Sequence, residues 1–61
     1  MAKDYYVCRD AYKLEDLAAK KYDFYAQNST DPEVKQLFLK VAQVQHQAAQ
    51  DFQQMINNYP Q

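Results

Sequence analysis

The chain contains no glycine and no tryptophan, and it has only two prolines and one cysteine among its 61 residues. Without glycine, the left-handed backbone conformations of tight β-hairpin turns are poorly supplied, so a hairpin-rich β fold is disfavoured. The single cysteine, Cys8, cannot form a disulfide within the chain. Its thiol is therefore either free or linked to another chain.

Charge and long apolar runs are also scarce. The net charge of -1 gives no clustered basic surface for a nucleic-acid backbone, so we expect no nucleic-acid partner. No apolar run approaches the roughly 18 residues of a membrane span. Residues 1–6 lack the apolar core of a secretion signal, and we expect a protein that is not secreted by a signal peptide.

The second half of the chain has the apolar periodicity of a long helix. Residues recur there at steps of three and four, which brings side chains to one helical face: Val34, Leu37, Val41, Val44, Ala48, Phe52, Met55 and Tyr59. Further apolar residues widen this sector beyond a two-position coiled-coil seam: Phe38, Ala42, Ala49 and Ile56. Such a broad sector indicates contact with more than one neighbouring helix.

The start of this helix can be formed in two ways. Thr30 and Glu33 have the spacing of a capping box. Alternatively, Asp31 caps the helix and Pro32 takes the first helical position, where its missing N–H is not needed. Both possibilities place the start of a helix here, and we expect it to run to about Asn58.

A first amphipathic helix of about 21 residues is predicted from about residue 7, with residues 28–33 as the break after it. Its apolar side carries Val7, Ala11, Leu14, Leu17, Ala18, Phe24 and Tyr25. Asp10 and Lys21 interrupt this side, and their side chains can reach its polar margin. We expect residues 1–7 to form a flexible N-terminal arm and residues 8–59 to form the helical hairpin domain.

Two long helices with a short connection pack as an antiparallel αα-hairpin, so the predicted fold class is all-α. One hairpin cannot cover both broad apolar sectors. We therefore expect a homodimer in which two hairpins form a ferritin-like four-helix bundle. The predicted core and dimer interface consists of Leu14, Leu17, Phe24, Leu37, Val41, Val44, Ala48, Phe52 and Met55.

No catalytic or cofactor-binding signature is present. The carboxylates are scattered over exposed faces and caps, whereas acid–base catalysis needs them to converge on a cleft. Ferritin-like metal sites use a Glu-x-x-His motif, but the corresponding pair here is Gln43 and His46, and a neutral amide is a poor ligand for such a site. We expect a non-enzymatic protein without a cofactor, with a surface His46. The alternative is a degenerate ferritin-like metal or redox protein that uses His46.

Four segments resemble the spore coat protein F (coat F) family of endospore-forming bacteria. They are residues 14–22 (LEDLAAKKY), 30–38 (TDPEVKQLF), 44–48 (VQHQA) and 52–55 (FQQM), and the resemblance covers about residues 14–59. It implies a ferritin-like helical hairpin without known enzymatic activity. It also implies a degenerate metal site, with Gln43 and either Ala18 or Lys21 at the positions of ligand glutamates.

The resemblance further implies a small structural or assembly protein linked to sporulation. Its partners would be a second copy of itself and other spore or coat proteins. Its location would be the cytoplasm of the sporulating cell or the spore coat.

Overall fold

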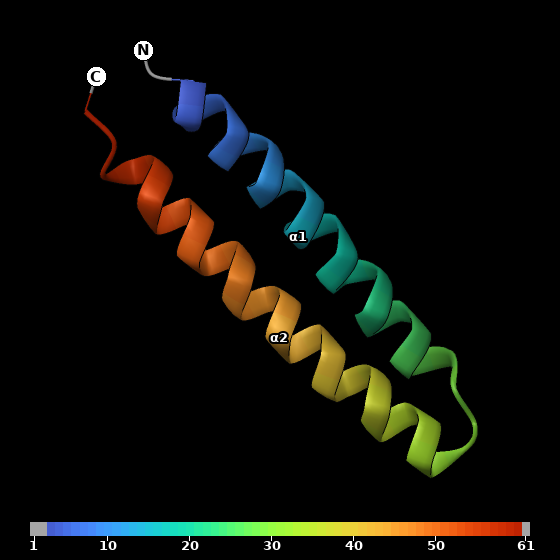
Figure 1. Ribbon diagram of the computed structural model, residues 1–61. Coiled ribbons are helices and arrows are strands. Elements are labelled where there is room, and N and C mark those ends of the chain that lie inside the picture. Colours follow the sequence, from blue (N-terminus) through green and yellow to red (C-terminus); the bar gives the residue numbers. More distant parts are fainter. Residues whose placement is uncertain (1–2, 61) are drawn as a thin grey trace.

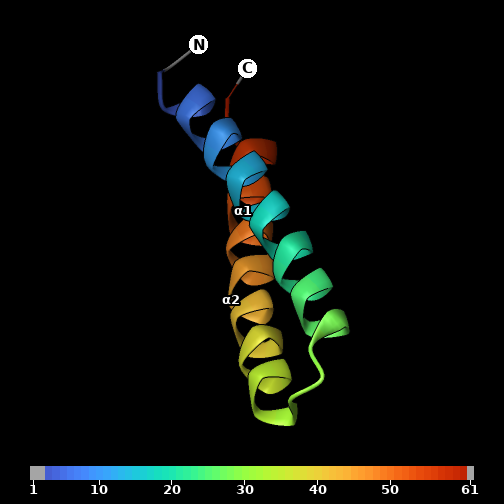
Figure 2. The same cartoon turned by 90° about the vertical axis from the view of Figure 1, so that its right-hand side faces the viewer.

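Two α-helices of equal length lie side by side in the computed structural model, which describes residues 3–60 (Figure 1). Helix α1 comprises Lys3–Asn28 and helix α2 comprises Pro32–Asn57. The helices run in opposite directions, and both ends of the chain lie at the same end of the molecule (Figures 1 and 2). The all-α antiparallel hairpin predicted from the sequence is thus confirmed.

The turn between the helices is made by polar side chains instead of glycine. The amide of Asn28 donates a hydrogen bond to the carbonyl oxygen of Phe24 at 2.8 Å, and the Ser29 hydroxyl donates to that of Tyr25 at 2.7 Å. These bonds satisfy carbonyl groups that the end of a helix leaves free. No residue in the range 3–60 has a positive φ angle, so the turn needs no left-handed residue.

Asp31 caps the start of α2. Its Oδ1 atom accepts hydrogen bonds from the backbone N–H groups of Glu33, at 2.9 Å, and Val34, at 3.4 Å. Pro32 occupies the first helical turn. Of the two caps that the sequence allows, the structure therefore contains Asp31 and not Thr30.

Helix α1 starts earlier than the sequence indicated. It begins at Lys3, so residues 3–7, which we expected to belong to a flexible arm, are helical; residues 1–2 lie outside the described part of the chain. The centroid of the Tyr5 ring lies 5.6 Å from that of Tyr59, which follows the end of α2 at Asn57. This contact stabilises the first turn of α1, because most helical stability in proteins comes from tertiary packing.

Small residues form the seam between the two helices. The fully buried residues are Ala19 and Ala26 on α1 and Ala42 and Ala49 on α2. Each pair is spaced by seven residues, which is the repeat of a coiled coil. Half-buried residues continue the seam along the rod: Tyr5, Cys8, Tyr12, Glu15 and Tyr22 on α1, Phe38, Gln45, Phe52 and Ile56 on α2, and Tyr59 after the end of α2.

The hairpin is a rod and not a compact domain. Its radius of gyration is 14.1 Å and its extents are 47 × 13 × 11 Å. A compact domain of this length has a radius of gyration of about 10.5 Å. The difference shows that two helices alone do not enclose a core.

Candidate functional site

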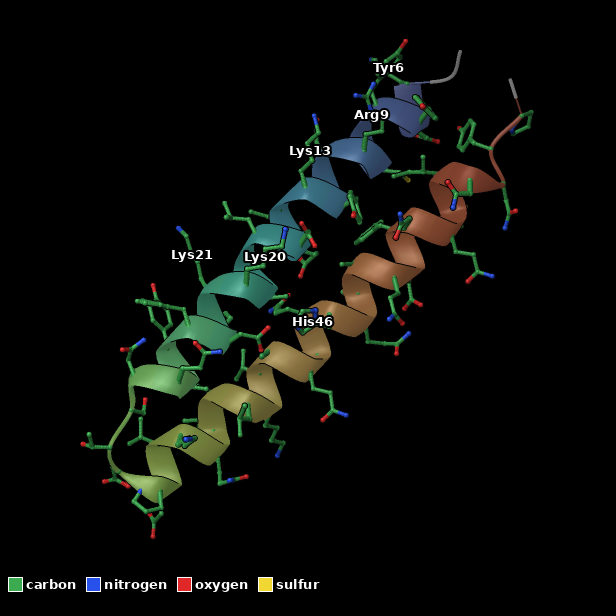
Figure 3. The ribbon with its side chains drawn as sticks, turned by 180° about the vertical axis from the view of Figure 1, so that it is seen from behind. Tyr6, Arg9, Lys13, Lys20, Lys21 and His46 are labelled. Carbon is green, nitrogen blue, oxygen red and sulfur yellow. The ribbon has the colours of Figure 1, made fainter. Side chains whose placement is uncertain are left out.

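One side of the hairpin is polar and is crossed by a contact between the helices. His46 Nε2 on α2 lies 2.7 Å from Asp23 Oδ2 on α1, and Figure 3 shows His46 between the two helices. Asp23 and His46 each lie four positions after a buried alanine, so these positions of both helices share one side. We call this the polar side; its polar residues are Arg9, Asp16, Asp23, His46 and Gln53, and the exposed Leu39, seven positions before His46, lies on the same side.

An ion pair lies near the polar side, within α1. The Lys20 ammonium is 2.9 Å from Asp16 Oδ2. This hydrogen bond, together with the negative charge of the carboxylate, raises the pKa of Lys20. The Lys20 side chain is 70% exposed, so solvent screens the pair and it adds little to stability.

The opposite side of the hairpin is apolar and open to solvent. Residues that directly precede the buried alanines lie on this side, and the apolar residues continue outward from there. Leu14 is 66% exposed, Val44 62% and Val7 60%. We call this surface the open flank; its exposed large side chains are Val7, Leu14, Leu17, Phe24 and Tyr25 on α1, and Val34, Leu37, Val44 and Met55 on α2.

The predicted interface residues lie on or beside this open flank, except Phe52, which belongs to the seam, and none of them is fully buried in the hairpin. Six are exposed: Leu14, Leu17, Phe24, Leu37, Val44 and Met55. Val41, Ala48 and Phe52 are half-buried. Sequence reasoning did not name Ala19 and Ala26, and it placed Ala42 and Ala49 in the apolar sector without assigning them to the contact between the helices. Their seven-residue spacing on both helices was the signal that would have separated the seam from the flank.

One carboxylate stands out at the seam. Oε2 of Glu15 is buried and has no hydrogen-bond partner among the described residues. Glu15 occupies a half-buried seam position close to the middle of α1. A buried polar atom without a hydrogen-bond partner lowers the stability of the folded state. The hairpin alone therefore does not satisfy the Glu15 carboxylate.

The remaining polar groups of the described residues are spread over the hairpin. A groove of about 230 Å³ is lined by Arg9, Tyr12, Lys13, Gln53, Ile56 and Asn57, and it contains neither a carboxylate nor a histidine. His46 is half exposed and contacts Asp23, while Gln43 is exposed. Within residues 3–60, no three His, Cys, Asp or Glu side chains gather closely enough to hold a metal ion.

Over the same residues, neither helix is long and apolar enough to cross a membrane. A comparison of the chain with protein-family models, with curated proteins and with solved structures finds no match.

Proposed function

We propose that the protein is a non-enzymatic assembly protein whose hairpins pair through the open flank to form a homodimeric four-helix bundle. The observation that carries this proposal is the contrast between the seam and the flank. Within residues 3–60, the fully buried side chains are alanines, whereas leucine, valine, methionine and aromatic side chains remain exposed along the rod.

The surface area supports the same conclusion. The chain exposes 4843 Å². A folded monomer of 7.2 kDa exposes about 4,100 Å². The excess of about 700 Å² is close to the roughly 800 Å² that each partner buries in a specific interface of standard size.

A second copy is the partner that suits this surface. The open flank follows both helices of a rod 47 Å long, so its occupant needs an apolar face of similar length and width. Another hairpin supplies such a face, and pairing the two flanks generates the closed two-fold symmetry that is most common among homo-oligomers. Exposed apolar surfaces of this extent mark interaction sites in soluble proteins.

The exposure of Val44 permits a sharp test. Because Val44 is 62% exposed in the hairpin, Val44→Asp leaves an isolated hairpin intact but places a charge in the proposed interface. We expect light scattering to give a dimer mass for the wild type and for the exposed control Gln43→Asp, and a monomer mass for Val44→Asp. A dimer mass for Val44→Asp would contradict the assignment of the open flank.

The resemblance to the coat F family adds a biological setting to this proposal. We propose that the dimer acts with other spore or coat proteins in an endospore-forming bacterium, in the sporulating cell or in the spore coat. An immunoblot should then show accumulation during sporulation and enrichment in purified spores. Equal abundance in growing cells would contradict this setting while leaving the self-association proposal intact.

A further inference from the structure

Two charged residues interrupt the apolar side of α1, and they cannot pair with each other. Asp10 and Lys21 are both exposed, and they are separated by about 16 Å along the helix at about 1.5 Å per residue. Neither forms an ion pair with another residue in the range 3–60. In Figure 3, Lys21 extends outward from α1 and away from α2. Within the described hairpin, neither charge therefore has a partner that stabilises it.

Their placement on α1 is symmetric. The helix runs from Lys3 to Asn28, and its midpoint falls between Glu15 and Asp16. Asp10 and Lys21 lie at equal distances on either side of this midpoint. The open-flank residues on α1 show the same relation: Leu14 mirrors Leu17, and Val7 mirrors Phe24.

We infer that two copies pack α1 against α1 in antiparallel orientation, around a two-fold axis that runs between the two α1 helices at the level of their midpoints. Lys21 then pairs with Asp10 of the partner subunit, and the symmetry forms this pair twice. Leu14 meets Leu17 of the partner subunit, and Val7 meets Phe24 of the partner subunit. The inference rests on the proposed self-association and specifies its orientation and register.

The other two-fold arrangement leaves the charges unpaired. A two-fold axis parallel to the helices would place α1 against α2 of the partner subunit at an unchanged height. The Tyr5–Tyr59 and Tyr25–Phe38 ring contacts show which residues of the two helices lie at the same level along the rod. The numbers of two such residues sum to about 64. Lys21 would then be level with Gln43 of the partner subunit, and Asp51 of the partner subunit would be about 12 Å away along the axis. Charge complementarity therefore favours the antiparallel pairing of α1 with α1.

The proposed axis also passes beside Glu15, whose buried Oε2 atom has no partner in the hairpin. The Glu15 side chains of both subunits approach the centre of the bundle at this height. Gln45 occupies a half-buried seam position of α2 about four residues away along the rod, so further polar side chains lie near this level. The dimer thus has a central polar layer between two apolar stretches, a device that fixes register in helical assemblies.

A charge exchange in the full-length protein tests the inference. Asp10→Lys and Lys21→Asp each place like charges opposite one another, at two symmetric positions. We expect each single variant to raise the dimer dissociation constant, measured by sedimentation equilibrium, by about tenfold. The double variant Asp10→Lys/Lys21→Asp restores the attraction with reversed sign and should return to within about threefold of the wild type.

The matched control is the exchange Asp16→Lys/Lys20→Asp, because this pair lies within one chain. We expect neither its single variants nor the exchange to change the dissociation constant by more than about threefold. If the Asp10 and Lys21 single variants have no effect, or if the double variant fails to restore dimerisation, the proposed register is overturned while the dimer stands. If the wild type is itself monomeric, the proposed function and this inference both fail.

Discussion

His46 Nε2 and Asp23 Oδ2 lie 2.7 Å apart and join the two helices across the polar side of the hairpin. The contact shows that Asp23 on α1 and His46 on α2 lie on the same side of the hairpin. Nine of the exposed large apolar side chains lie on the opposite side, where they form the open flank; Leu39 and Tyr6 are exposed outside it.

The His46–Asp23 pair should contribute modestly to stability. Its side chains are 47% and 43% exposed, and exposed pairs of this kind contribute less than about 1 kcal/mol. We expect His46→Ala to lower the free energy of unfolding by less than that amount and to leave the dimer mass unchanged. If protein purified without chelators instead contained stoichiometric iron, manganese or zinc that His46→Ala removed, a ferritin-like metal function would replace the assembly function.

The seam alanines should not tolerate larger side chains. Ala42 is 2% exposed, so Ala42→Leu forces the helices apart. We expect a loss of about 1–3 kcal/mol in the free energy of unfolding, measured by urea denaturation. Gln43→Leu, one position away on the exposed surface, is the control and should change stability by less than about 0.5 kcal/mol. Equal effects of the two substitutions would show that the alanine seam is not the contact between the helices.

The helix cap offers a choice between two neighbouring residues. Asp31→Ala removes the acceptor for the N–H groups of Glu33 and Val34 and should cost about 1 kcal/mol. Thr30→Ala should have little effect, because the Asp31 side chain already accepts those bonds. The reverse order of effects in thermal melts would indicate the Thr30–Glu33 capping box.

Glu15 should be a destabilising residue. A buried carboxylate without a partner is more costly than a buried amide of nearly the same shape, and the proposed axis brings a second carboxylate close to it. We therefore expect Glu15→Gln to raise the melting temperature. A lower melting temperature would mean that the Glu15 carboxylate accepts a strong hydrogen bond in the assembled protein.

Much of the fold follows from the sequence because local signals agree with the packing. The apolar periodicity of residues 34–59 predicts α2, and Asp31 with Pro32 predicts its start. The first turn of α1 was harder to foresee, because its stability depends on a contact between Tyr5 and the distant Tyr59. Local sequence patterns carry no information on such a contact.

The inner and outer faces were also hard to separate from periodicity alone. Large apolar residues such as Leu14 and Val44 dominate the pattern, yet the hairpin packs through alanines. Ala19 and Ala42 contribute little to any measure of hydrophobicity, but their small size lets the helices approach closely. The large residues are left for a second neighbour, and this division is visible only when the two helices are placed together.

Sedimentation equilibrium of the wild-type protein, over concentrations from micromolar to millimolar, tests the central claim most directly. Coverage of the open flank by a second copy predicts a molar mass that reaches twice 7.2 kDa and then stays constant. A mass of 7.2 kDa at every concentration, from protein that remains helical, would contradict it.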